Sequence, residues 1–361
     1  MNNNLNDENK RIVPAETNIS EDELVERLNA PPEKPRRLRG RRLIPILVVI
    51  LLVTIANNFV ISRFDHFGGL RNFLPTSAGQ HRTNVDPVPI PADGIRASLP
   101  ITLTADLVNA RIVIEPHNAN DIFITYDSPR RGQFVPPRYS LNGTTLDITQ
   151  ESPNFNFGAS SNSGGVITIF VPQDTNNVFD LLQLSTISGG ISIDGNTGVY
   201  LADNLLVSST SGEITANNFS VMDNLDFSVI SGRIRASNLS AHRDFTARST
   251  SGRVNVEYIV AETVTASSTS GATSASYVTA DQITVRSTSG RVRMDNLQTD
   301  NLVAGSTSSG VQLQDSQITG EITLSAVSGR ITLNNVDANP NLMNLSTVSG
   351  RITVDGNRWH N

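Results

Sequence analysis

Five arginines recur at a regular interval in the second half of the chain, and each directly follows a glycine. They are Arg233, Arg253, Arg291, Arg330 and Arg351. A guanidinium group stays charged and donates several hydrogen bonds, so a row of them could bind a cell-wall polymer or acidic polysaccharide. Ala272 interrupts the row, and like charges on neighbouring strands repel each other. A solvated edge whose long side chains shield the backbone is therefore the favoured interpretation, and binding of a polyanion is the alternative.

An acidic row precedes the same glycines by nine residues. Its members are Asp203, Asp223, Glu262 and Asp281, with Asp300 displaced by one position. Carboxylates are ligands for calcium, but the spacing is not that of the glycine-rich nonapeptide repeats that bind this ion. We therefore expect a solvated edge and no metal site.

Residues for acid–base catalysis are scattered. The histidines are His66, His81, His117, His242 and His360, and no lysine follows Lys34. Enzymes that cleave polysaccharides gather carboxylates with basic side chains on one face, so a carbohydrate-active enzyme is the less favoured interpretation. The chain has no cysteine, which excludes thiol catalysis, cysteine-ligated zinc and iron–sulfur clusters. We predict a protein that is not an enzyme, with no catalytic residue and no cofactor.

The charge is unevenly distributed. The net charge is −6, but the first 42 residues carry +1, which leaves −7 for the rest. A nucleic-acid-binding protein needs a basic surface to contact phosphates, and an acidic body does not provide one. Nucleic acid is therefore not an expected partner.

A Ser-Gly pair repeats through the second half of the chain. Its glycines are Gly189, Gly212, Gly232, Gly252, Gly271, Gly290, Gly310, Gly329 and Gly350, at intervals of 19 to 23 residues. Apolar residues alternate after each pair, and a period of two indicates strands. Each unit reads as strand, corner, short strand, corner, strand, corner. Such units cannot bury their apolar residues alone, so stacking is required.

This pattern predicts an all-β fold, a parallel β-solenoid (β-helix) with about 20 residues per coil. A sandwich of hairpins explains the strands but not the constant period. At the corners, glycine permits either a positive φ or a close approach of two backbones, and the neighbouring Ser and Thr hydroxyls can satisfy turn amides. The direction in which the coils wind does not follow from the sequence.

The regular repeat is expected over residues 181–356. Residues 95–180 lack the Ser-Gly marker but contain strand patterns, at 111–115, 121–126, 144–149 and 166–171. We interpret this region as irregular first coils that cap the solenoid. Residues 357–361 form the C-terminal cap, in which Trp359 covers the last coil.

An uncharged apolar segment at residues 43–62 is long enough to cross a bilayer as one helix. Six cations lie between Lys34 and Arg42, directly before it, so we expect a single-pass cell-membrane protein with a cytoplasmic N-terminus and an extracellular solenoid. Residues 1–42 are then a cytoplasmic tail, mostly disordered, with a short helix at 21–29, and residues 63–94 a Pro-rich spacer. A cleaved signal peptide is the alternative.

The repeat resembles a known family. A strand ending in Val171-Pro172, followed by STISGGISIDG and then by STSGRV and VSGRITV units, is similar to a bacterial family of β-strand-repeat proteins described as adhesins, formally a domain of unknown function. The resemblance covers residues 95–356 and implies a membrane-anchored protein of the cell surface, with no catalytic residues. It implies adhesion, or a scaffold that interacts with a wall polymer, polysaccharide or envelope protein. Envelope-stress sensing, passed through the tail to a cytoplasmic partner, is the alternative function.

Overall fold

The computed structural model describes residues 87–98, 101–128, 135–151, 165–174, 178–196 and 200–358. The expected tail, the span at 43–62, the spacer as far as residue 86 and Trp359 lie outside the described residues. Among the described residues, the only helix is a short 3-10 turn, η4 (Pro340–Leu342), and no helix is long and apolar enough to span a membrane.

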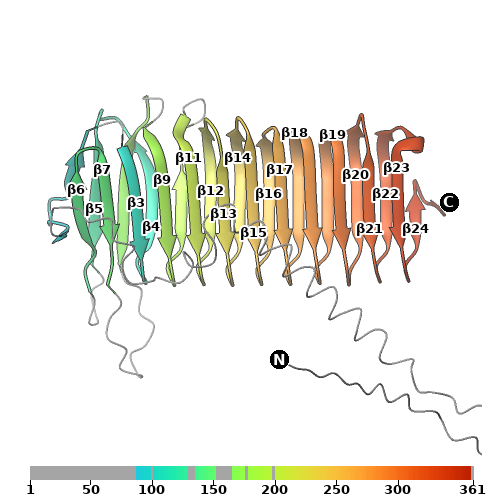
Figure 1. The fold of residues 1–361 in the computed structure, drawn as a ribbon, viewed down its shortest axis with the longest axis horizontal. Coiled ribbons are helices and arrows are strands. Elements are labelled where there is room, and N and C mark those ends of the chain that lie inside the picture. The colour runs from blue at the N-terminus through green and yellow to red at the C-terminus, as the bar shows by residue number, and fades with distance from the viewer. Residues whose placement is uncertain are drawn as a thin grey trace, which may run out of the picture. The chain divides into compact units, whose positions relative to one another are not determined.

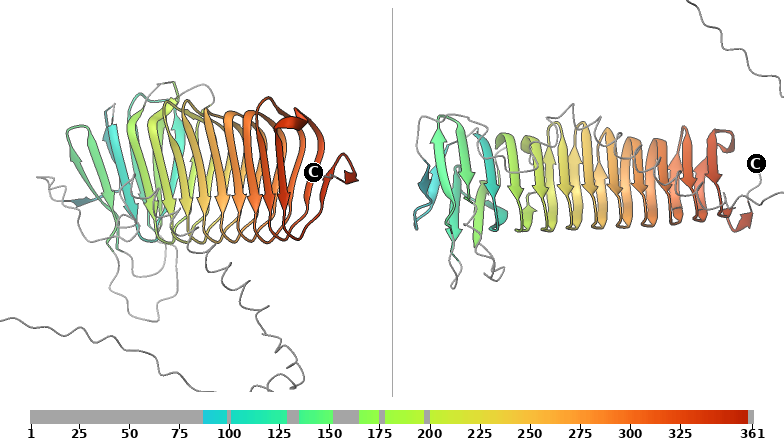
Figure 2. Two further views of the ribbon diagram at one scale, coloured as in Figure 1. Left: turned by 45° about the vertical axis from the view of Figure 1, so that its right-hand side comes forward. Right: turned by 60° about the horizontal axis from the view of Figure 1, so that its bottom comes forward.

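The regular part is a parallel β-solenoid, as the repeat predicts (Figures 1 and 2). Its strands are β9 (Phe179–Thr186), β10 (Ile191–Asp194), β11 (Tyr200–Ser209), β12 (Ile214–Val221), β13 (Leu225–Val229), β14 (Ile234–Ala241), β15 (Asp244–Ser249), β16 (Val254–Val260), β17 (Thr263–Ser268), β18 (Thr273–Ser287), β19 (Val292–Ser306), β20 (Val311–Ile318), β21 (Ile322–Ala326), β22 (Ile331–Ala338), β23 (Met343–Thr347) and β24 (Ile352–Val354). Neighbouring coils pair in register, so that Ile234 lies between Ile214 and Val254.

Alternation along each strand builds one continuous core. In β12 the side chains of Ile214, Ala216 and Phe219 are buried, whereas the residues between them face outward. Phe227 and Phe245, on adjacent coils, pack edge to face with centroids 5.9 Å apart. Each fully buried aliphatic or aromatic side chain contributes about 1.5 to 3 kcal/mol, and the stacked coils share these contacts.

The repeat glycines allow two backbones to approach closely. A Cβ atom on Gly212 would lie 1.8 Å from the carbonyl oxygen of Gly189, and one on Gly232 would lie 1.7 Å from that of Gly212. These glycines do not have positive φ, so close approach is the reason for glycine here. The expected hydroxyl contacts are present: the Gly212 amide donates to Ser209 Oγ, and this hydroxyl donates to the Gly189 carbonyl.

Gly310 does not occupy a corner, contrary to the prediction from the Ser-Gly spacing. Ser309 takes the corner position, since its amide donates to Ser306 Oγ and its carbonyl oxygen is the atom that a Cβ on Gly329 would meet, at 1.8 Å. Val311 pairs with Val292 and Ile331, which places Gly310 one residue beyond the corner. The acidic row is accordingly regular, because Asp300 lies nine residues before Ser309.

In seven successive coils, a second corner is made by a residue other than glycine with positive φ. These residues, here called the second-corner column, are Asn218, Asn238, Tyr258, Tyr277, Asn296, Asp315 and Asn335, with φ between 48° and 61°. Asn and Asp adopt this left-handed conformation more readily than other side chains. Neighbouring asparagines also bond to each other: Asn238 Nδ2 donates to Asn218 Oδ1 at 2.9 Å.

The N-terminal region caps the solenoid, but its coils are not arranged in sequence order. Its strands are β1 (Val88–Pro89), β2 (Ile95–Ala97), β3 (Ile101–Leu107), β4 (Arg111–His117), β5 (Ile122–Asp127), β6 (Arg138–Asn142), β7 (Thr145–Thr149) and β8 (Val166–Pro172). β3 lies between β7 and β9, and β4 lies between β8 and β10, so the later pair β7–β8 is the outer coil. β5 and β6 then pair antiparallel with β8 and β7. Antiparallel strands cover edges that would otherwise be open to another chain.

The other end closes with a hairpin. β25 (Asn357–Arg358) pairs antiparallel with β24 through Asp355 and Gly356, whose φ angles are 47° and 78°. Positive φ at both central residues is the requirement of a type I′ turn. The first two residues of the expected C-terminal cap, 357 and 358, form the second strand of this hairpin.

Candidate anion-binding site

The residue after each corner starts an outward-facing row, the post-glycine column. It consists of Gly190, Glu213, Arg233, Arg253, Ala272, Arg291, Gly310, Arg330 and Arg351. Backbone hydrogen bonds join successive coils here, for example from Ile234 N to the Arg253 carbonyl and from Thr273 N to the Arg291 carbonyl. The parallel register therefore stacks these positions one above another.

Two further arginines lie on the same face. Arg235 and Arg293 stand two residues after Arg233 and Arg291, and both are exposed. Side chains two residues apart in a strand point to the same side of the sheet. These two arginines were not among the residues predicted from the sequence, although the alternation along the strand places them beside the row.

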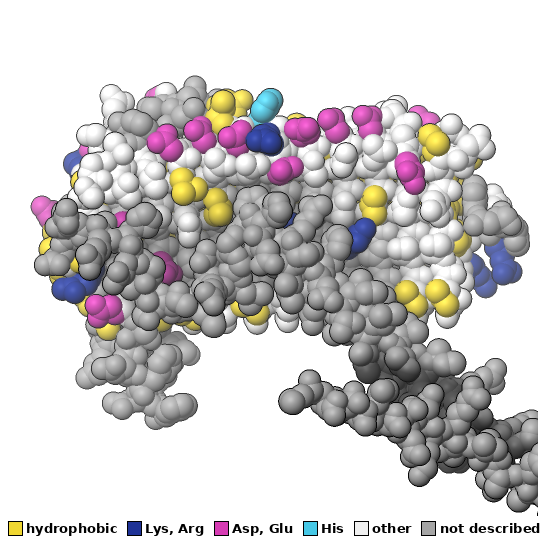
Figure 3. Space-filling model, in the orientation of Figure 1, with side chains coloured by type: hydrophobic (Ala, Val, Ile, Leu, Met, Phe, Trp, Pro, Cys, Tyr) yellow, Lys and Arg dark blue, Asp and Glu magenta, His cyan; other side chains and the backbone are white. Residues whose placement is uncertain are grey.

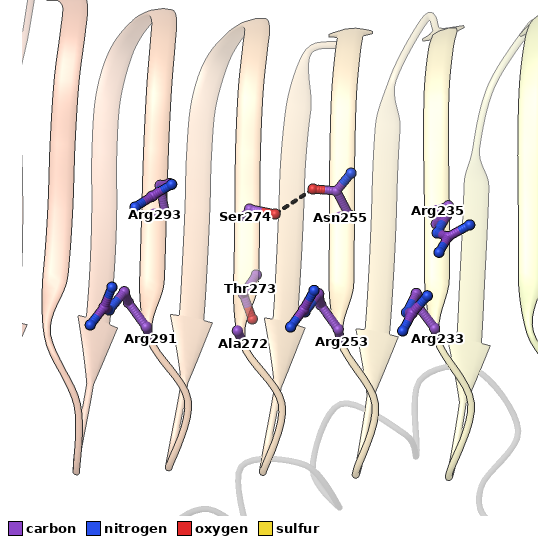
Figure 4. A pocket seen from close by; sticks show the side chains of 9 residues that line it. All are labelled: Arg233, Arg235, Arg253, Asn255, Ala272, Thr273, Ser274, Arg291 and Arg293. Carbon is purple, nitrogen blue, oxygen red and sulfur yellow. Dashed lines mark hydrogen bonds between the residues drawn. The ribbon is translucent and has the colours of Figure 1, made fainter.

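Five arginines surround a hollow of about 420 Å³, called here the arginine hollow (Figure 4). Its lining residues are Arg233, Arg235, Arg253, Asn255, Ala272, Thr273, Ser274, Arg291 and Arg293. Ala272 lies between Arg253 and Arg291, and its methyl group leaves open the space that an arginine would fill. Ser274 donates a hydrogen bond to Asn255 Oδ1 beside it. The interruption of the row is thus what creates the hollow.

The arginine hollow carries an excess of positive charge. Glu213 Oε1 lies 3.3 Å from Arg235 Nε and 4.0 Å from Arg233 Nη1. Such exposed ion pairs contribute only about 0 to 1 kcal/mol. Within the described part of the chain, Arg253, Arg291 and Arg293 form no salt bridge. Their guanidinium groups therefore remain available to pair with an anion placed over Ala272.

The other two predicted arginines lie elsewhere on the same column. Arg330 and Arg351 border a separate hollow of about 410 Å³ near the C-terminal hairpin, together with Arg358. Gly310, which has no side chain, lies between this pair and Arg291 in the column. The predicted row of five is therefore divided into two groups.

The acidic row forms an edge of the coils (Figure 3). Backbone hydrogen bonds connect its members from coil to coil, from Asp223 N to the Asp203 carbonyl and from Asp281 N to the Glu262 carbonyl. Arg243 fills the position between Asp223 and Glu262. Within the ranges that the structure describes, no three acidic or histidine side chains are placed to hold a metal ion.

Two carboxyl groups with a raised pKa lie away from the arginine hollow. Burial raises the pKa of Asp106 in β3, partly offset by a hydrogen bond with Ser185. Burial also raises the pKa of Asp226 in β13, and Arg248 at 3.4 Å partly offsets it. These carboxyl groups belong to different coils.

A comparison with protein families places most of the described chain in one family. The model described as Toastrack DUF4097, a domain of unknown function, matches residues 101–271 and 240–360. The two matches overlap and together extend from β3 to the C-terminal hairpin. No curated protein matches the sequence.

Proposed function

We propose that this chain, which belongs to the Toastrack DUF4097 family, is a non-catalytic scaffold of the cell envelope that binds an anionic polymer in the arginine hollow. The observation that carries the proposal is the cluster of five arginines around Ala272, of which only Arg233 and Arg235 form ion pairs, both with Glu213, among the described residues. Guanidinium groups are well suited to carboxylates and phosphates because they offer paired N–H donors.

A polymer fits the hollow better than a small anion. The hollow is shallow and spans the coils that begin at Arg233, Arg253, Ala272 and Arg291, which recur at about 4.8 Å. An extended polyanion can place successive charges over successive coils. The chain beyond residue 42 carries −7, so attraction is confined to this local cluster and must weaken as salt screens it.

The Arg233→Gln, Arg253→Gln and Arg291→Gln triple variant is expected to bind polyglutamate and polygalacturonate roughly tenfold more weakly than the native chain. Removing three exposed charges should leave the melting temperature almost unchanged. Binding of the full-length chain would be measured by titration at two salt concentrations, and native affinity should fall steeply with salt.

The matched control is the Arg330→Gln, Arg351→Gln and Arg358→Gln variant, which removes the same charge from the second hollow. It should bind both polymers as the native chain does. Equal losses in the two triple variants would show that only net charge matters, and undiminished binding by the first variant would remove the arginine hollow from consideration.

We further propose that residues 43–62 anchor the solenoid outside the cell membrane, on the strength of the uncharged segment and the preceding cations. Protease added to intact cells, or to protoplasts where a wall intervenes, should remove a C-terminal epitope and spare an N-terminal one. Lysed cells should lose both epitopes. Protection of the C-terminal epitope would contradict the orientation, and a soluble mature form beginning near Asn57 would identify a cleaved signal instead.

A further inference from the structure

Two tyrosines in the second-corner column form a stacked pair on the surface. The rings of Tyr258 and Tyr277 are nearly parallel, with centroids 4.6 Å apart and planes 7° from each other. Their exposed fractions are 50% and 44%. Each ring covers one face of the other, and the neighbouring corner residues, Asn238 and Asn296, have shorter side chains. One face of each ring is therefore left for a ligand.

Stability alone does not explain tyrosine at these positions. Tyr258 and Tyr277 have φ of 52° and 53°, a conformation that is unfavourable by roughly 1 to 2 kcal/mol for an ordinary side chain. The other members of the column are Asn or Asp, which tolerate it. Stacking of the two rings recovers only about 0.5 to 1.5 kcal/mol for the pair. Backbone strain of this kind often marks a site whose side chains are needed for binding.

The tyrosine pair and the arginine hollow share the same coils. Ser274 lines the hollow, and Tyr277 follows three residues later, a distance of roughly 10 Å along the strand. On the adjacent coil, Asn255 and Tyr258 have the same relation. A polymer leaving the hollow along these strands reaches the rings.

From this juxtaposition we infer that one sugar ring of the bound polymer packs against the tyrosine pair, so that the ligand is an acidic polysaccharide. The inference rests on the proposed function of the arginine hollow. The C–H face of a pyranose ring is flat and apolar and extends an aromatic stack, while its hydroxyl groups remain free to hydrogen-bond. A polyanion without sugar rings, such as polyglutamate, has no flat apolar face to pack against the two tyrosines.

The residues between hollow and rings favour a sugar over a nucleic acid. Glu257, Ser276 and Asp295 lie side by side in adjacent coils, directly before the second corner. Carboxylate and hydroxyl oxygens accept hydrogen bonds from the hydroxyl groups that each sugar ring of a polysaccharide carries, whereas the backbone within a DNA strand has no hydroxyl group to donate. Bases also stack on tyrosine, so single-stranded DNA is the competing ligand to be tested.

The Tyr258→Asn and Tyr277→Asn double variant tests the inference, because asparagine is the residue that the same column uses at Asn238 and Asn296. It should fold and melt at or above the native temperature. Its affinity for polygalacturonate should fall about tenfold, equivalent to about 1.4 kcal/mol, while its affinity for polyglutamate stays unchanged. The Tyr258→Phe and Tyr277→Phe control keeps the stack and should bind polygalacturonate as the native chain does.

The outcomes separate the two proposals. If the native chain binds neither polymer, the proposed function fails and this inference fails with it. If the native chain binds both polymers and the asparagine variant binds both equally well, only the role of the tyrosine pair is wrong. Tighter native binding of oligo-dT than of polygalacturonate, lost in the asparagine variant, would overturn the sugar in favour of a nucleic acid.

Discussion

Replacing Gly252 with alanine is expected to lower the free energy of unfolding by about 3 kcal/mol or more. The added methyl group would overlap atoms of the next coil, and a tightly packed structure cannot accommodate such an overlap without moving its backbone. The added Cβ would lie 1.5 Å from the carbonyl oxygen of Gly232 and 2.5 Å from its carbonyl carbon. Both are backbone atoms of the next coil, so no rotamer change relieves the contact. The coils must separate, which weakens the hydrogen bonds that join them, such as Ser251 N to the Ile230 carbonyl.

The matched control is Gly190→Ala, at a glycine directly after a corner. A Cβ there would lie 3.4 Å from the carbonyl oxygen of Glu213, an ordinary contact, and Gly190 does not have positive φ. Its stability should change by less than about 0.5 kcal/mol. Urea denaturation of the two variants and the native chain measures the three free energies of unfolding. Similar midpoints for the two variants would mean that the close approach of two backbones is not the reason for glycine at the corner.

The solenoid could be predicted because its causes are local and repeated. Alternation with a period of two indicates strands, and a constant interval near 20 residues indicates that successive units stack. The position of the third-last corner could not be predicted from glycine alone, because Ser308-Ser309-Gly310 allows either alignment. Counting back from the first buried strand residue, Val311, identifies Ser309, since burial sets the register.

A second corner in each coil was predicted, but the residues that form it, with positive φ, were not identified although their signal is present. Asn218, Asn238, Asn296 and Asn335 recur at the interval of the repeat, and asparagine is typical of a left-handed turn. The two tyrosines conceal the pattern, because bulky side chains argue against that conformation. In the structure, the same exception, a bulky side chain at a position with positive φ, is what distinguishes the tyrosine pair.

The cap and the arginine hollow depend on non-local contacts. The strand patterns of β4, β5, β7 and β8 were predicted, but nothing local indicates that β7 and β8 lie outside β3 and β4. Likewise, the sequence alone indicates only that Ala272 interrupts a row of arginines. Stacked between Arg253 and Arg291, its small side chain makes room for a ligand.

Replacing Val254 with aspartate is expected to cost several kcal/mol of stability, because it places an unpaired carboxyl group in the core. The Val254 side chain is 0% exposed and lies between Ile234 and Thr273 of the adjacent coils. Thr273 Oγ1 already donates to the Arg286 carbonyl.

The loss of stability caused by Val254→Asp should increase as the pH rises. Burial disfavours the charged form, so the introduced carboxyl should have a higher pKa in the folded chain than its value of about 3.9 in the unfolded chain. The folded state then binds more protons above that pH, and stability relative to the native chain should fall as pH rises from about 4 toward 7. Urea denaturation at the two pH values measures the difference.

Thr250→Asp provides the control, since Thr250 is exposed in the turn before Gly252 and an added carboxylate there remains in water. Its stability should differ from the native value by less than about 0.5 kcal/mol at pH 7. Equal losses at positions 250 and 254 would contradict the inward and outward assignment of these side chains. The arginine hollow depends on that assignment, because Arg253 and Asn255 face outward only if Val254 between them faces inward.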